Sequence, residues 1–171
     1  MRPVAPPGAP GARARAGSGG TDRVAFGAME LTEQQRAHLD ANAAAGMITV
    51  GRDGRPKVVR VGIGLVGDKV WSSGTRDRRR TQRLRADPRC TLYVPDAGHA
   101  FLAVECDVTI LDGADAPELS VRFFRQLQGN PTGPIAWFGQ PLDEEQFRQT
   151  MVDEGRIIYE MTPVKVYGLL M

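Results

Sequence analysis

The sequence predicts a mainly β domain in which an antiparallel sheet closes into a barrel with flanking helices. Five strand-like runs precede residue 112, at 47–51, 57–66, 69–73, 89–95 and 100–111. Short turns join several of them, at Asp53-Gly54, Gly67-Asp68 and Asp96-Ala-Gly98. Parallel neighbours need long crossover connections, whereas antiparallel neighbours can follow one another through tight turns. Connections this short therefore favour an antiparallel meander that closes into a barrel.

One domain accounts for most of the chain, which at 171 residues has the length of a single domain. The first recognisable element begins at Met29, so the folded domain is expected to span 29–171. Residues 1–28 are rich in Ala, Gly, Pro, Arg and Ser and carry few large apolar side chains. Such a segment buries too little surface to offset its ordering entropy, which predicts a disordered tail. A nucleic-acid-binding arm is the alternative reading of its four arginines.

Three helices are predicted outside the arginine-rich region. Thr32-Glu-Gln-Gln35 has the pattern of a capping box, and Gly46 suits the position after a helix, which predicts a helix over about 33–45. A second helix begins at Asp115-Ala-Pro-Glu118 and ends at Gly129.

The third helix covers 143–155, where acidic residues in the first turn suit the helix dipole. Residues 156–161 and 164–169 follow it as a final strand pair or as one bent strand, interrupted at Pro163. Between the second and third helices, Trp137-Phe138 lies in a Gly/Pro-rich loop and suits a substrate lid, a plug over the core or a dimer contact.

The run 57–66 has one face almost without side chains. Its first face carries Val59, Val61, Ile63 and Leu65, and its second carries Val58, Arg60, Gly62 and Gly64. Two glycines at alternate positions weaken a strand unless something lies against them. That partner is either a second backbone or bulge, or a planar ring held against backbone N–H and C=O groups.

The most unusual stretch of the sequence is Trp71-Ser-Ser-Gly-Thr75 followed by seven arginines between residues 76 and 89. A helix fits the arginine run, with Thr75 or Asp77 as N-cap and Pro88 marking its end. Small polar residues, backbone N–H groups at a helix start and clustered guanidinium groups all suit a phosphate. The pattern therefore predicts an anion site, with a solvated helix as the alternative.

The distribution of charge favours a small anion over nucleic acid. Residues 76–89 carry a local charge of +5 within a domain that is otherwise acidic, whereas a nucleic-acid-binding domain usually spreads basic charge over a whole face. No apolar run approaches the roughly 20 residues that cross a bilayer, and the N-terminus lacks the apolar region of a secretory signal. Cys90 and Cys106 fall in strand-like runs, as expected for buried free thiols of a cytoplasmic protein.

No catalytic or metal-binding motif emerges from the sequence. The two histidines, His38 and His99, stand in unrelated contexts, and no Cys/His spacing fits zinc. A chain with a ring-binding strand, an anion site and no evident catalytic group suggests that a bound cofactor carries the reaction.

Several short motifs then resemble one family in order and spacing. They are Gly54-Arg-Pro56, Arg60-Val-Gly-Ile63, Trp71-Ser-Ser-Gly-Thr75, Arg78-Arg-Arg-Thr81, Leu84-Arg-Ala-Asp-Pro-Arg89 and Val164-Lys-Val-Tyr-Gly168. Together they resemble the pyridoxamine-phosphate-oxidase-like split-barrel superfamily, in particular its branch of flavin/deazaflavin oxidoreductases that use coenzyme F420. The resemblance covers about residues 30–170.

This resemblance implies a split β-barrel homodimer with a cofactor at each side of the interface. It implies that Val59, Arg60 and Val61 hold the ring, largely through backbone groups. It also places Ser72, Ser73, Gly74 and Thr75 along the ribityl chain, and Arg78, Arg79, Arg80 and Thr81 at the phosphate. The expected activity is hydride transfer between F420 and a small unsaturated or heteroaromatic substrate, with FMN as the alternative cofactor and neither nucleic acid nor membrane as a partner.

Overall fold

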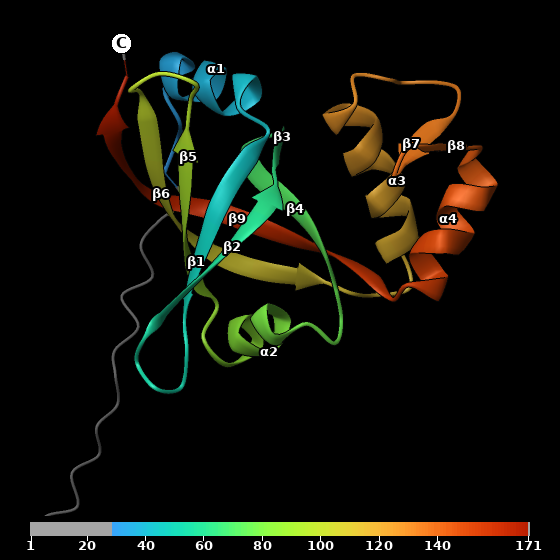
Figure 1. Cartoon of the computed structure of the whole chain (residues 1–171), viewed down its shortest axis with the longest axis horizontal. Helices are drawn as coiled ribbons and strands as arrows, with labels where there is room; N and C mark the ends of the chain where they lie inside the picture. Colours follow the sequence, from blue (N-terminus) through green and yellow to red (C-terminus); the bar gives the residue numbers. More distant parts are fainter. Residues whose placement is uncertain (1–28, 171) are drawn as a thin grey trace, which may run out of the picture.

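A computed structural model describes residues 29–170 of the chain (Figure 1). The predicted tail at 1–28 lies outside these residues. Seven strands form one antiparallel sheet in the order β2-β1-β5-β6-β9-β4-β3. Their bounds are β1 Ala44–Val50, β2 Pro56–Gly62, β3 Gly64–Val66, β4 Lys69–Thr75, β5 Arg89–Pro95, β6 Phe101–Leu111 and β9 Arg156–Leu169. The predicted antiparallel, mainly β fold is confirmed.

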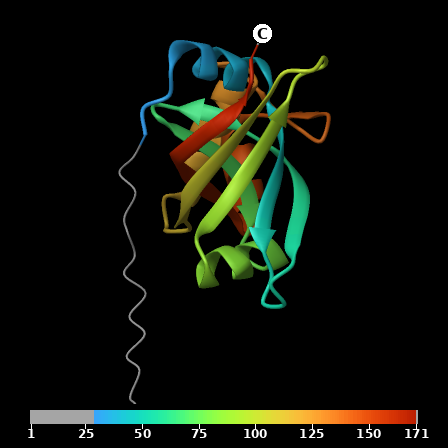
Figure 2. The same ribbon diagram turned by 90° about the vertical axis from the view of Figure 1, so that its left-hand side faces the viewer.

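The sheet curls into a barrel that stays open along one line. Strand β2, at one end of the sheet, pairs only with β1, yet it comes close to β4 near the other end. No ladder joins β2 to β4, so the barrel is split between them. Helix α1 (Glu33–Ala41) lies at one end of this barrel and helix α2 (Arg79–Ala86) at the other (Figure 2).

The predicted single run 57–66 is divided in the structure. Strand β2 ends at Gly62, and β3 begins at Gly64 on the opposite edge of the sheet. At the break, the N–H of Ile63 donates to the carbonyl of Ala43 at 3.0 Å. Because Ile63 is buried, its side chain anchors the crossing of the chain from one edge of the barrel to the other.

The barrel core is lined by the inward-facing residues that alternate along each strand of the sheet. Cys90 on β5 and Cys106 on β6 stand directly opposite each other in this core, and both are buried free thiols as the sequence predicts. The contact with Cys90, together with burial, raises the pKa of the Cys106 thiol well above its ordinary value. The charged thiolate is disfavoured in such a site.

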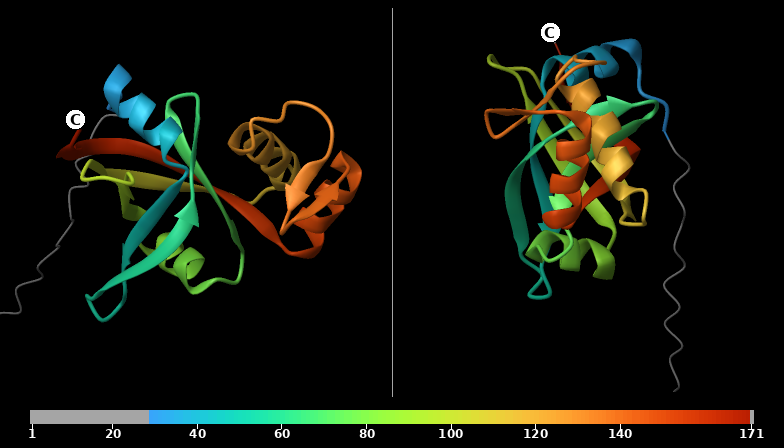
Figure 3. Two further views of the ribbon diagram at one scale, coloured as in Figure 1. Left: turned by 45° about the horizontal axis from the view of Figure 1, so that its top comes forward. Right: turned by 90° about the vertical axis from the view of Figure 1, so that its right-hand side faces the viewer.

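A second layer covers the outer face of β3, β4 and β9. It consists of α3 (Ala116–Leu127), α4 (Glu144–Asp153) and a small hairpin of β7 (Ile135–Trp137) and β8 (Gln140–Leu142), which lie together on one side of the sheet (Figure 3). Phe123 of α3 packs with Trp71 of β4 and Ile158 of β9. The two helices match the sequence prediction, whereas the hairpin was expected to be a loop.

Strand β9 is one bent strand, which was one of the two predicted alternatives. Its register against β6 shifts between Glu105 and Cys106, opposite Pro163. A bulge at this position suits Pro163, because proline cannot donate to a ladder. The bend lets β9 pair with β6 along its length and with β4 in its first half.

Two helix ends differ from the sequence prediction. The capping box of Thr32 and Gln35 is present, but α1 ends at Ala41 and Gly46 lies within β1, paired with Arg60. The Asn42 amide donates to the carbonyl of His38 at 2.8 Å and satisfies the helix end. The helix is therefore shorter than predicted, because 44–50 pairs along the sheet between β2 and β5.

Helix α2 begins later than predicted. Its N-cap is Arg78, which makes no side-chain capping bond, so neither Thr75 nor Asp77 is the N-cap. Instead the Thr75 hydroxyl donates to the Asp77 carboxylate at 2.6 Å, which lowers the pKa of Asp77. The helix stops before Pro88, as predicted. None of the helices in 29–170 is both long and apolar enough to cross a membrane.

Candidate functional site

The split of the barrel brings together two strand segments that the sequence singles out. Strand β3 pairs with Lys69–Trp71 only, so β4 continues from Ser72 to Thr75 without a partner on that edge. The edge of β2 that faces away from β1 is likewise unpaired. Open edges expose backbone N–H and C=O groups. The β2 and β4 residues of the predicted site therefore lie on either side of one opening.

On β2, the three predicted ring-binding residues point in opposite directions. Val59 and Val61 face the barrel core, and Val61 is buried there. Arg60 lies on the outer face opposite Gly46, and its side chain is exposed. Of these three residues, only the backbone and the Arg60 side chain are therefore accessible.

On β4, Ser72 and Ser73 carry buried hydroxyl oxygens that have no hydrogen-bond partner within the described residues. Their side chains lie on opposite faces of the strand, since Ser72 pairs with Tyr159 and Ser73 with Ile158. An unsatisfied buried hydroxyl costs about 1–3 kcal/mol. Two consecutive ones at an open strand edge are donors that the protein leaves unused, which fits a polar ligand chain beside β4.

Gly74 creates the space for an aromatic side chain that the sequence does not single out. A Cβ at Gly74 would collide with the ring and hydroxyl of Tyr159, which is fully buried. The Tyr159 ring can lie across β4 only because this position has no side chain. Gly74 thus contributes a cavity for Tyr159.

Tyr159 connects the sheet to the start of α2 through a directed series of hydrogen bonds. The Thr81 hydroxyl donates to the carbonyl of Thr75 at 2.7 Å and lies 2.6 Å from the Tyr159 hydroxyl. Because the Thr81 hydroxyl already donates its single hydrogen to Thr75, Tyr159 must be the donor between the two hydroxyls. Tyr159 in turn accepts from Nε of Arg80 at 3.3 Å.

Arg80 is held at the open end of β4. Its Nη2 donates to the carbonyl of Ser73 at 3.0 Å, and its guanidinium carbon lies 5.4 Å from the centre of the Tyr159 ring. A cation near an aromatic face is attracted by the ring quadrupole. The remaining N–H groups of Arg80 are free to bind an anion beside Ser73.

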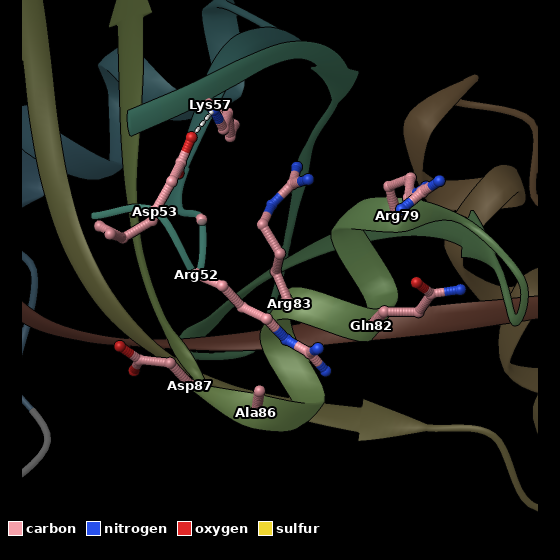
Figure 4. Close-up of a pocket in the computed structure, with 10 residues that line it drawn as sticks. Arg52, Asp53, Lys57, Arg79, Gln82, Arg83, Ala86 and Asp87 are labelled. Atoms are coloured by element: carbon pink, nitrogen blue, oxygen red, sulfur yellow. Dashed lines mark hydrogen bonds and ion pairs between the residues drawn. The ribbon is translucent and has the colours of Figure 1, made fainter. Parts of the chain in front are cut away.

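The other predicted phosphate-binding residues are not gathered around Arg80. Thr81 is buried and its hydroxyl is fully used. Arg78 is exposed at the N-cap, and Arg79 lines the rim of a separate cleft between α2 and the β1–β2 turn, with its guanidinium directed away from that turn (Figure 4). One helix start therefore presents Arg79 and Arg80 to two different environments.

The ring-binding interpretation of the Gly62 and Gly64 face is wrong for this arrangement. A Cβ at Gly64 would lie 3.4 Å from the ring of Phe123 and 3.7 Å from Leu127, both on α3. A Cβ at Gly62 would also meet Leu127, at 3.9 Å. Side chains of helix α3 therefore lie on this side of the strand, within ordinary van der Waals reach of a Cβ at either position.

Tyr159 is the residue of this site that sequence reasoning missed. It lies in a mostly apolar strand, Arg156–Leu169, in which nothing marks a functional position. Gly74, the next-to-last residue of β4, was the available signal, because a glycine inside a strand often marks a close approach. Within 29–170, no three His, Cys, Asp or Glu side chains are gathered as a metal site would need.

Residues 31–169 match the family model described as pyridoxamine 5'-phosphate oxidase. The matched part includes all strands of the sheet and all four helices of the described residues.

Several solved structures share the fold. An F420 reductase is 20% identical with a TM-score of 0.58, over 80% of this chain and 98% of the reductase. A conserved hypothetical protein from Mycobacterium tuberculosis has a TM-score of 0.64 at 16% identity, over 82% of this chain and 85% of its own. The heme storage protein HutZ from Vibrio cholerae has a TM-score of 0.57 at 14% identity, over 81% and 94%. At these identities the likeness establishes the fold alone.

Proposed function

Because the chain belongs to the pyridoxamine 5'-phosphate oxidase family, we propose that it is an oxidoreductase that uses coenzyme F420. The proposed reaction transfers a hydride between the deazaflavin and a small unsaturated or heteroaromatic organic substrate. The structural likeness to an F420 reductase supports this choice of cofactor. FMN is the alternative cofactor, and it would bind through the same groups.

The observation that carries this proposal is the position of Arg80. The Arg80 guanidinium is fixed beside the open edge of β4 by Tyr159 and by the carbonyl of Ser73. A fixed guanidinium loses little freedom when it binds a phosphate and offers a fork of N–H donors. A phosphorylated cofactor carries a phosphate, a polar chain and a flat ring. These parts match, in order, Arg80, the serines without hydrogen-bond partners and the unpaired strand edges.

In this proposal the protein binds and orients the cofactor. Arg80 binds the phosphate, the exposed Arg78 at the start of the same helix adds positive charge, and the segment Ser72–Thr75 lies along the ribityl chain. Backbone groups of Val59–Val61 on the opposite edge hold the ring. When bound, the reduced deazaflavin supplies the hydride that the substrate accepts. The protein residues contribute by holding donor and acceptor in a reactive orientation.

The test is a titration that compares F420 with FMN, in which the change in cofactor fluorescence reports binding. We expect saturable binding of F420 that is at least about tenfold tighter than that of FMN. Binding of FMN with no binding of F420 would transfer the proposal to the alternative cofactor, and binding of neither would refute it.

A double substitution, Arg78→Ala with Arg80→Ala, tests the phosphate assignment. It should weaken cofactor binding by about 100-fold, because charge-assisted bonds to phosphate are worth about 1.5–3 kcal/mol each. Arg55→Ala, at the exposed β1–β2 turn, is the matched control and should bind normally. Equal affinity of the double variant and the control would remove the phosphate from this position.

We further propose a homodimer that buries the outer face of β2, β1, β5, β6 and the end of β9. Five of the seven large apolar residues that are exposed in 29–170 lie on this face: Val50, Val58, Tyr93, Tyr167 and Leu169. Exposed apolar patches of this kind mark interaction sites. Arg60 belongs to the same face, so a partner subunit there would lie beside the proposed ring site. The two free buried thiols support a cytoplasmic location.

A further inference from the structure

The side of α2 that faces away from Arg80 forms one wall of a second basic site. Here the β1–β2 turn and α2 enclose a cleft of about 530 Å³ (Figure 4). Arg79 and Arg83 line it from the helix, and Arg52 and Lys57 line it from the β1–β2 hairpin. Four residues with cationic side chains thus line one concavity, two from each wall.

The two acidic residues of this cleft, Asp53 and Asp87, leave its three guanidinium groups without an ion pair among the described residues. Asp53 binds Lys57 at 2.9 Å, and Asp87 is engaged with Arg89, at 2.7 and 2.8 Å. The side chains of Arg52 and Arg79 make no hydrogen bond or ion pair with any other described residue. Lys57 is therefore paired, whereas the guanidinium groups of both walls are not balanced by a carboxylate.

One of the cations is held in place by the fold. Nε of Arg83 donates to the hydroxyl of Thr49 at 2.8 Å, and Thr49 is buried in β1. This bond anchors the Arg83 side chain between helix and hairpin, where Figure 4 shows it pointing up from α2. Arg79 lies one turn earlier on the same helix, and like charges at this spacing repel one another. An anion between the walls would relieve that repulsion.

From this geometry we propose that the cleft is a second anion site, which binds a small molecule carrying two adjacent anionic groups such as a diphosphate. A single phosphate is small compared with the cleft volume and would leave one wall unbalanced. A diphosphate can accept bonds from the helix and the hairpin together, and guanidinium groups are suited to bind phosphate in pairs. The site is separate from Arg80 and does not depend on the identity of the cofactor.

Calorimetric titration of pyrophosphate into the full chain tests this proposal. The informative variant is Arg52→Gln with Arg79→Gln, because it removes one charge from each wall and breaks no bond within 29–170. The matched control is Arg55→Gln with Arg78→Gln, which removes one charge from the hairpin and one from the start of α2, both outside the cleft lining. Thermal unfolding checks that both variants are folded.

The titrations are run with the cofactor site filled by saturating F420 or FMN, because the proposed phosphate-binding group of Arg80 also binds anions. Under this condition we expect one saturable pyrophosphate site in the wild type, weakened at least about tenfold in the cleft variant and less than about twofold in the control. Three outcomes would overturn the proposal: no saturable binding, equal weakening in both variants, or competition between pyrophosphate and a bound cofactor. If the wild type binds pyrophosphate in the cleft but binds neither F420 nor FMN, the result would instead count against the proposed function.

Discussion

At the scale of single residues, Tyr159 determines where the charge of Arg80 is placed. Its buried ring lies over Gly74, and its hydroxyl stands between Nε of Arg80 and the Thr81 hydroxyl. A long arginine side chain loses rotamer freedom when it is fixed, and a preorganised partner reduces that cost on binding. The residue that positions the anion-binding group therefore comes from a strand distant in the sequence.

The substitution Tyr159→Phe removes the hydroxyl and keeps the ring. It should lower the free energy of unfolding by about 1–2 kcal/mol, because the buried Thr81 hydroxyl and Arg80 each lose a partner. Cofactor affinity should fall about three- to tenfold, since Arg80 is then less well fixed. Urea unfolding and cofactor titration measure the two effects. The control is Tyr167→Phe, because the Tyr167 hydroxyl makes no hydrogen bond within 29–170. An unchanged cofactor affinity in Tyr159→Phe would show that Tyr159 does not position Arg80.

At the scale of elements, the β7–β8 hairpin carries an unusual turn. Trp137 pairs with Gln140, and the two residues between them have positive φ, 45° at Phe138 and 82° at Gly139. Turns of this kind favour Asn-Gly, because most side chains are strained in the left-handed region. Phe138 is nonetheless 85% exposed and touches the edge of Trp137, with ring centres 4.8 Å apart.

Phe138→Asn should therefore stabilise the protein by up to about 1 kcal/mol, which raises the Tm by roughly 2–4 °C for a chain of this size. Differential scanning calorimetry measures the change. Phe138→Val provides the opposite case, because a β-branched residue tolerates positive φ poorly. If the asparagine variant melts below the wild type, the ring contact with Trp137 outweighs the backbone strain.

The pairing of α3 with α4 depends on ionised glutamates. Glu144 accepts from Arg125 at 2.7 Å and from Arg148 at 2.9 Å, and these bonds, chiefly that to Arg125, lower its pKa. Arg148 also binds Glu118 of α3. The two helices are thus joined by guanidinium groups that share carboxylates.

A lowered carboxyl pKa contributes stability that is present above the unfolded-state value and disappears as the pH falls through the folded-state value. The difference in stability between wild type and Glu144→Gln should accordingly be full at pH 6–7 and shrink below about pH 4.5, the ordinary glutamate value. Urea unfolding across pH 3–7 measures it. Glu30→Gln should follow the wild type at every pH. A constant difference between wild type and Glu144→Gln would mean that the charge of Glu144 contributes nothing.

At the scale of the whole molecule, one face of the sheet is left without a second layer. Helices α3 and α4 cover β3, β4 and the first half of β9, whereas no helix within residues 29–170 packs across the outer side of β2, β1 and β5. Figures 1 and 3 show this division of the molecule into a covered and an uncovered side. The proposed dimer would supply the missing layer.

Val58→Glu tests that proposal, because Val58 lies on the uncovered face, in strand β2, and is 65% exposed. Sedimentation velocity should find a dimeric wild type and a variant whose dimer is at least about tenfold weaker, since a charge would be buried without a partner. Val152→Glu on α4, at 54% exposure, is the matched control and should remain dimeric. A monomeric wild type at micromolar concentration would contradict the assignment of this face.

The sequence predicted those parts of the molecule that rest on local patterns. The alternation of Leu102, Val104 and Val108 identified β6, and Thr32 with Gln35 identified the start of α1. The three-residue strands β7 and β8 were missed because so few residues show no periodicity. Their hairpin is stabilised instead by Trp137 packing on Phe124 and Phe147.

The candidate site was predicted in composition but not in arrangement. The arginine cluster was recognised from charge density, yet the separation of Arg79 from Arg80 depends on where α2 begins. A helix starting at residue 76 would have turned these side chains toward other neighbours, because successive residues differ by about 100° around a helix. The phase of a short helix is set by tertiary contacts, here Thr81 and Leu84 buried against the barrel.

Chemical labelling of the opposed thiols of Cys90 and Cys106 can measure how often the barrel opens. Both lie inside the core on neighbouring strands, and the raised pKa of Cys106 suppresses the reactive thiolate. A thiol reagent can modify them only when β5 and β6 are exposed to solvent, so the labelling rate measures the free energy of that fluctuation. No probe needs to be introduced, because the natural chain carries two cysteines and both lie at this one position in the core.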